Sequence, residues 1–143
     1  AKRHTLFQAR MSLTLHHIAI ICSDFARSKH FYTDVLGLRI VREVFRAERN
    51  SWKLDLALDN GMFIELFSFP DPPKRPSYPE ACGARHIAFG VEKLDAEIER
   101  LKQHGVECEP IRIDEMTGAR FTFFSDPDGL PLELYEKAPA TVK

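Results

Sequence analysis

Four side chains that can bind a metal recur at matching places in two related stretches of the sequence: His17, Glu65, His86 and Glu133. His17 begins the run His-Ile-Ala-Ile, and His86 begins the run His-Ile-Ala-Phe. Glu65 lies in Ile-Glu-Leu-Phe, and Glu133 lies in the matching run Leu-Glu-Leu-Tyr. Imidazole nitrogens together with carboxylate oxygens suit zinc, nickel, iron, cobalt or manganese, whereas magnesium and calcium prefer oxygen ligands alone. We therefore predict one divalent cation held by these four residues.

Both histidines are expected on strand faces that leave room for a ligand. Side chains alternate across a strand, so residues two positions apart share a face. His17 shares its face with Ala19 and Ile21, and His86 shares its face with Ala88 and Gly90. Because most of these neighbours are small, a cavity can form beside each imidazole.

The two glutamates sit among apolar residues, where an unpaired carboxylate costs several kcal/mol to bury. A lone histidine or glutamate in such a place is usually a core residue with a local partner. Under that structural interpretation, however, a duplicated chain would have kept the costly carboxylates of Glu65 and Glu133 without any chemistry. Recurrence in register favours the metal site. The cation could act as a Lewis acid on a carbonyl or enediolate while a carboxylate moves a proton.

Each half of the sequence predicts the same order of elements, a strand and a helix followed by further strands. The periodicity of apolar residues predicts strands at 15–22, 38–45, 52–58 and 62–69 and a helix at 25–36 in the first half. It predicts strands at 86–91, 106–113, 120–125 and 130–135 and a helix at 94–104 in the second. Gly37 and Gly105 follow the two helices at matching places, where a left-handed residue is useful.

The repeat defines the expected domain organisation. One module is expected at 13–69 and another at 84–137. The proline-rich stretch at 70–83 cannot be a central strand and is expected to be an extended linker. Residues 1–12 and 138–143 are expected to be tails.

Composition narrows the class of partner. Hydrophobic residues make up 44% and charged residues 29% of 143 residues, as in ordinary globular domains. A net charge of -1 gives no basic footprint for nucleic acid or a membrane surface, so a small-molecule substrate is expected. Three cysteines without CxxC spacing indicate neither a disulfide framework nor a sulfur-rich zinc site, and a cytoplasmic location is expected.

Other chemically capable residues have simpler interpretations. His16 is expected on the face opposite His17, against the helix or in solvent, and Cys22 in the core. Several aromatic residues could line a substrate pocket or pack in the core: Trp52, Phe63, Phe67 and Phe121.

Six motifs together resemble the vicinal-oxygen-chelate superfamily, which includes glyoxalase I, methylmalonyl-CoA epimerase, fosfomycin-resistance proteins and extradiol dioxygenases. They are HHIAI at 16–20, FY and LGL within 31–38, IELF at 64–67, RHIAFGV at 85–91 and DPDGLPLEL at 126–134. The resemblance covers residues 15–136 and is nearest to the glyoxalase-like bacterial branch. It implies an α+β fold in which two βαβββ modules form an eight-stranded cup around the metal.

The resemblance also implies roles. The family's four metal ligands fall on His17, Glu65, His86 and Glu133, with zinc or nickel as the expected ion. By the same resemblance Glu133 is the general base, and Glu65 is a second carboxylate able to return the proton. The implied activity is that of a metal-dependent lyase or isomerase related to lactoylglutathione lyase, acting on a small carbonyl substrate through an enediolate. A homodimer is expected, with the cup closed either within one chain or across two.

One departure from the pattern of bacterial glyoxalase I disfavours glutathione as part of the substrate. Bacterial glyoxalase I has an arginine and an asparagine where this chain has Ile21 and Phe69. Arg46, Lys53 and Arg120 are the remaining candidates for anchoring an anionic substrate.

Three alternatives stay open. An iron-dependent dioxygenase of the superfamily would use two histidines and one glutamate, so the extra carboxylate of Glu65 disfavours it. An epimerase would use the same ligands. A binding protein of the bleomycin-resistance kind would hold a small molecule in the cup without catalysis.

Overall fold

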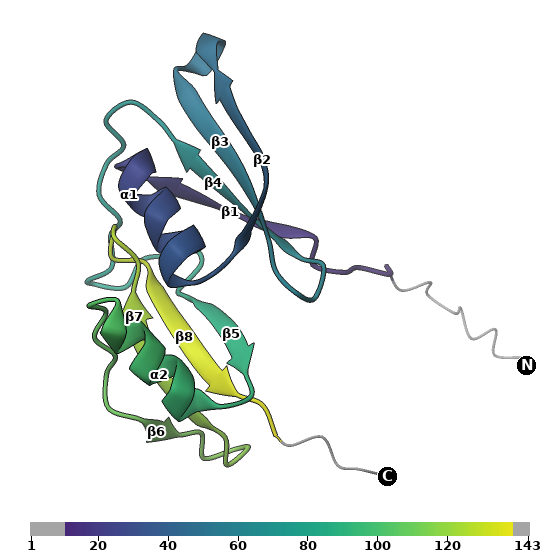
Figure 1. Ribbon diagram of the computed structural model, residues 1–143, viewed down its shortest axis with the longest axis vertical. Coiled ribbons are helices and arrows are strands. Elements are labelled where there is room, and N and C mark those ends of the chain that lie inside the picture. Colours follow the sequence, from purple (N-terminus) through teal and green to yellow (C-terminus); the bar gives the residue numbers. More distant parts are fainter. Residues whose placement is uncertain (1–10, 139–143) are drawn as a thin grey trace, which may run out of the picture.

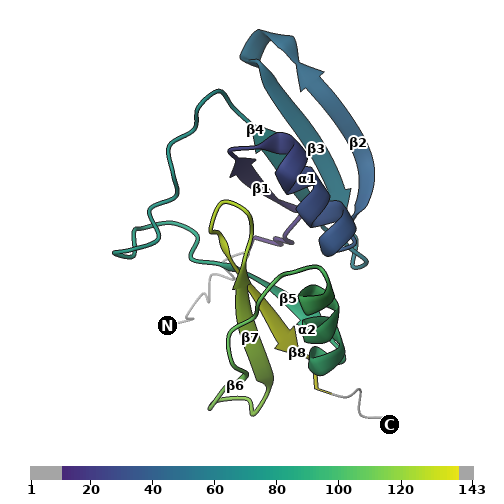
Figure 2. The same ribbon diagram turned by 60° about the vertical axis from the view of Figure 1, so that its left-hand side comes forward.

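The computed structural model describes residues 11–138, which fold into two modules of strands and helices (Figure 1). The predicted tails therefore lie mostly outside the described residues. Each module has one four-stranded sheet and one principal helix, so the α+β class and the βαβββ order are confirmed. In Figures 1 and 2 the helices α1 and α2 lie next to each other on one side of the molecule.

The first module contains strands β1 to β4, in the sheet order β1-β4-β3-β2. Its elements are β1 (His17–Cys22), α1 (Phe25–His30), the π-helical turn η1 (Phe31–Val35), β2 (Arg39–Arg46), the 3₁₀ turn η2 (Ala47–Arg49), β3 (Ser51–Ala57) and β4 (Phe63–Ser68). The predicted helix at 25–36 is thus α1 continued by η1. Asp24 caps α1, because its side chain accepts a hydrogen bond from the Arg27 backbone at 3.0 Å.

The second module repeats this order with the sheet β5-β8-β7-β6. Its elements are β5 (Ile87–Val91), α2 (Leu94–Gln103), β6 (Arg112–Ile113), β7 (Arg120–Ser125) and β8 (Pro131–Glu136). Gly105 after α2 has φ 76°, and Gly37 after η1 has φ 78°, as the repeat predicts.

The strand predicted at 106–113 is wrong over most of its length. Only β6, Arg112–Ile113, pairs with β7. The preceding segment makes one isolated backbone bond, from Glu109 N to Phe123 O at 2.8 Å. Pro110 has no N–H to continue the ladder, which accounts for the interruption.

One hydrophobic core joins the two modules. It takes the helix-facing side chains of both sheets, such as Leu54, Leu66 and Leu132, together with Tyr32 and Leu101 from the helical segments.

Polar contacts also cross between the modules, two of them from the equivalent positions Tyr32 and Arg100. The Tyr32 hydroxyl donates to buried Asp126 at 2.8 Å, and Arg100 donates to the Val35 carbonyl at 2.5 Å. The modules are therefore held side by side through their helices, and the other face of each sheet carries the predicted ligands.

The segment between β4 and β5 forms no strand, as its prolines predict. Among residues 11–138 no helix is both long and apolar enough to cross a membrane.

Candidate metal centre

The first pair of predicted ligands meets at the edge of the first sheet. β1 and β4 are parallel neighbours, with Ala19 opposite Glu65 in the register. His17 Nε2 lies 3.4 Å from Glu65 Oε2, and the two side chains are 44% and 19% exposed. Ile18, Ile64 and the other residues of alternate parity face the core, so this pair faces away from α1. A partly exposed imidazole and a more buried carboxylate thus lie in contact at the edge of the sheet.

His16 corrects the prediction that it would lie apart from His17. Its Nδ1 is 2.9 Å from Nδ1 of His17, and its ring lies 5.7 Å from that of Phe63. Because this contact engages Nδ1 of His17, Nε2 is the nitrogen that remains for Glu65 or a cation. Partners of this kind orient the ligating ring, and the doubled histidine in the sequence was the signal for it.

A line of alternating charges extends from Glu65 across the same face of the sheet. Lys53 Nζ lies 2.8 Å from Glu65 Oε1 and 3.2 Å from Asp55 Oδ1. Arg42 contacts the other oxygen of Asp55 through two nitrogens, at 2.9 and 2.8 Å. Burial opposes ionisation of Asp55, but Arg42 and Lys53 outweigh it and lower its pKa. The hydrogen bond to Glu65 is the main reason that the pKa of Lys53 is raised.

The second pair lies at the equivalent place in the second sheet. His86 directly precedes β5, and its Nε2 is 2.9 Å from Glu133 Oε2. The side chains are 34% and 10% exposed. Phe123 is opposite Glu133 in the register, and its ring meets the His86 ring edge to face at 5.0 Å. Glu133 is therefore a buried carboxylate in contact with His86.

Aromatic rings, rather than charges, extend from this second pair. Phe121 and Phe123 lie next to each other on β7, with ring centroids 6.0 Å apart. The Arg112 guanidinium lies 5.2 and 5.1 Å from their centroids. A cavity of about 880 Å³ opens beside His86, and Arg27, Arg85 and Arg112 are among its lining residues.

The structure brings the four predicted ligands together as two pairs. Within residues 11–138 no group of three or more His, Cys, Asp or Glu side chains is close enough to hold a metal. The donor chemistry of each pair, one imidazole nitrogen and one carboxylate oxygen, fits half of a mixed nitrogen and oxygen site.

The three candidate anion anchors have different surroundings. Lys53 lies in the charged line beside Glu65. Arg46 lies with its guanidinium 4.7 Å from the Phe67 ring centroid. Arg120 instead bonds Glu136 and Asp95 beside α2, because its parity on β7 places it on the helix-facing side. That arginine is wrongly predicted as an anchor.

The four aromatic residues singled out from the sequence lie outside the buried core. Phe63, Phe67 and Phe121 are half-buried on the ligand-bearing faces, whereas Trp52 stacks on Phe25 beside α1. Cys22 is buried as predicted, and burial raises its pKa to about 11.

Residues 14–134 match the family described as the Glyoxalase/Bleomycin resistance protein/Dioxygenase superfamily. The chain belongs to this superfamily. An Escherichia coli (strain K12) relative named "Uncharacterized protein YaeR" is 61% identical over 123 residues, covering 86% of this chain and 95% of the relative. "Uncharacterized protein YwkD" of Bacillus subtilis (strain 168) is 58% identical over 124 residues, covering 87% and 97%.

A solved structure supports the same membership in the glyoxalase and dioxygenase superfamily. A glyoxalase family protein from Enterococcus faecalis is 49% identical and superimposes with a TM-score of 0.81, covering 86% of this chain and 97% of that one. The superfamily and its fold are therefore shown.

Proposed function

We propose that this chain is a divalent-metal-dependent lyase or isomerase of the glyoxalase I type, acting on a small carbonyl compound. The observation that carries the proposal is the pair of equivalent contacts, His17 with Glu65 and His86 with Glu133. A structural duplication alone has no need to keep an imidazole beside a shielded carboxylate twice. Zinc or nickel is the proposed resident ion, because both accept this mixed ligand set.

The two half-sites are proposed to meet across a homodimer. Each pair lies on a sheet face turned away from the shared core, and the first strands there present small residues such as Ala19 and Ala88, both exposed. The same face carries Ile21, which is 55% exposed. A second copy would cover these residues and bring His17 and Glu65 opposite its own His86 and Glu133.

A cation held by these four residues would supply a Lewis acid that eases removal of a proton next to a carbonyl. Glu133 is proposed to take that proton, since it is buried and, among residues 11–138, forms no ion pair with a lysine or arginine. The neighbouring rings of Phe121 and Phe123 exclude water from the transferred proton. Glu65 is the second carboxylate, with one oxygen already engaged by Lys53.

The proposed substrate class is a small α-keto aldehyde adduct or a related carbonyl compound. A Vibrio cholerae relative named "Probable lactoylglutathione lyase" is 30% identical over 135 residues, which supports related chemistry. Ile21 and Phe69 stand where the resemblance places the residues that help hold glutathione, so glutathione itself is not proposed. The free cysteines Cys22, Cys82 and Cys108 fit a reducing compartment, and we place the protein in the cytoplasm.

Metal analysis joined to a substrate screen tests this proposal. The purified protein should have a dimeric mass by light scattering and retain about one divalent ion per chain. It should also turn over one of a panel of keto aldehyde adducts, with loss of activity on chelation and recovery with zinc or nickel. Protein that stays metal-free and monomeric at saturating metal would contradict the proposal and favour a binding protein. Turnover that needs ferrous iron and oxygen would favour a dioxygenase.

A further inference from the structure

Two carboxylates face each other on neighbouring strands in the first half-site. Asp55 on β3 is directly opposite Glu65 on β4 in the register, an arrangement that repels when both are ionised. Lys53 lies between them, within 3.2 Å of one and 2.8 Å of the other. Its ammonium group is thus shared, with the shorter contact to Glu65.

Lys53 is not needed to neutralise Asp55. Arg42 already contacts Asp55 Oδ2 through two nitrogens, at 2.9 and 2.8 Å. The two oxygens of Glu65 are divided instead, with Oε2 toward His17 and Oε1 toward Lys53. Lys53 is itself 25% exposed and held by Asp55, so it restrains the Glu65 carboxylate.

We propose that Lys53 is a positioning residue that reserves one oxygen of Glu65, so that Glu65 offers a single oxygen to the cation. This inference rests on the proposed metal-dependent function. A carboxylate can bind a metal through one oxygen or both. With Oε1 reserved, one more position on the cation stays open for water or substrate, and catalytic metal sites need such a position.

The second half-site lacks this restraint. Phe123 occupies the position opposite Glu133, and Phe121 occupies the position equivalent to Lys53. Lys53 therefore gives different roles to two glutamates that occupy equivalent positions in the repeat. Glu65 is fixed as a ligand, and Glu133 is free to move a proton.

Manganese bound to the full-length protein gives a direct test, because water exchanging on Mn²⁺ is counted by proton relaxation. In Lys53→Met, Glu65 should bind through both oxygens and displace one exchangeable water relative to the wild type. Its affinity for Mn²⁺, measured by titration calorimetry, should become about tenfold tighter, because a nearby positive charge is also removed. Lys53→Arg should restore the wild-type water count.

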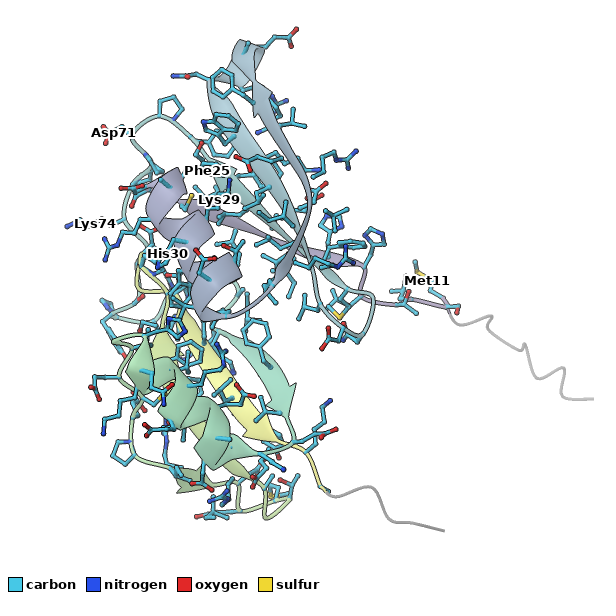
Figure 3. All side chains as sticks on the ribbon, in the orientation of Figure 1. Met11, Phe25, Lys29, His30, Asp71 and Lys74 are labelled. Atoms are coloured by element: carbon cyan, nitrogen blue, oxygen red, sulfur yellow. The ribbon has the colours of Figure 1, made fainter. Side chains whose placement is uncertain are left out.

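Lys29→Met is the matched control. Lys29 lies on α1 (Figure 3) and pairs with Glu43 at 2.5 Å on the helix-facing side of the sheet, so its loss should leave the water count and the Mn²⁺ affinity unchanged. Lys53→Gln serves as a second variant if Lys53→Met fails to fold. The inference is overturned if Lys53→Met, or Lys53→Gln in its place, binds Mn²⁺ with the wild-type water count. Failure of the wild type to bind Mn²⁺ would instead overturn the proposed metal-dependent function on which the inference rests.

Discussion

The two modules share their strand order and their imidazole–carboxylate pair, but charged and aromatic residues exchange faces between them. On the ligand-bearing face, the first module has Lys53 and Asp55 where the second has Phe121 and Phe123.

On the helix-facing side the chemistry is reversed between the modules. Trp52 stacks on Phe25 with ring centroids 5.2 Å apart in the first module. At the position equivalent to Trp52, the second module has Arg120, which bonds Glu136 and Asp95. The comparison shows that the duplicated fold keeps residues at equivalent positions, while the type of residue at those positions differs between the modules. The imidazole–carboxylate pair is the exception. Two glutamates in equivalent positions can therefore have different roles.

The largest expected effect is a difference in kcat between variants of the two glutamates. Glu133→Gln should lower kcat by about 10³-fold while dimer mass and thermal stability stay near those of the wild type, because a general base is lost. Glu65→Gln should mainly weaken the affinity for metal and recover much of kcat at saturating metal. Steady-state kinetics across a metal titration distinguish the two. Equal losses of kcat in both variants would break the assignment of different roles.

The free energy of unfolding should respond differently to salt when a charged residue or an aromatic residue beside the candidate site is removed. Asp55→Ala should lower the free energy of unfolding by about 2 kcal/mol, because Arg42 and Lys53 lose their shared partner. Phe123→Ala should cost a similar amount through lost apolar burial. Urea unfolding at low and high salt separates the causes, since only the Asp55 variant should differ less from the wild type as salt rises. Identical salt dependence would contradict the contrast between the faces.

One of the contacts between the modules, Tyr32 with Asp126, should make the free energy of unfolding depend on pH. Burial raises the pKa of Asp126, while the Tyr32 hydroxyl favours its ionised form. Tyr32→Phe should cost about 1 kcal/mol and raise that pKa further. A raised folded-state pKa means that stability is lost as pH rises through it. Chemical denaturation should thus show a larger deficit for the variant at pH 8 than at pH 4. A deficit independent of pH would contradict this explanation.

The smallest effect concerns the ion pair beside α2. Arg120 and the Leu94 N–H hold the pKa of Glu136 at about 2. A lowered pKa contributes stability above the unfolded value, and that contribution is lost as the pH falls toward 2. Glu136→Gln should therefore have a slightly lower Tm than the wild type at pH 6, with the gap narrowing at pH 3. A gap that widens in acid would refute the assigned direction.

The sequence predicted the fold well where local signals agree. The repeated strand and helix order and the glycines after the helices follow from short-range patterns. The strand expected at 106–113 was a wrong prediction over most of its length. Its apolar residues have strand periodicity, but Pro110 interrupts the hydrogen-bonded ladder. His16 was placed on the wrong side because strand alternation was extended one residue before β1 begins.

The histidines and glutamates of the candidate site could be singled out from the sequence, whereas the residues around them could not. His17 and Glu65 stand out because their types recur in the second half. Lys53 was noted only as a possible anchor, because its contact with Glu65 depends on the register between β3 and β4. The proposed joining of the two pairs into one site needs a second chain, and strand periodicity carries no information about such a partner.

Hybrid dimers test the central claim most directly. A chain with His17→Ala and a chain with His86→Ala, each carrying a different affinity tag, are coexpressed, and dimers containing both are purified through both tags. If each site combines His17 of one chain with His86 of the other, one site in the hybrid keeps both histidines. The hybrid should then bind one tightly held Mn²⁺ per two chains, while each variant homodimer binds none tightly. A hybrid with no tight Mn²⁺ site would contradict completion across the dimer.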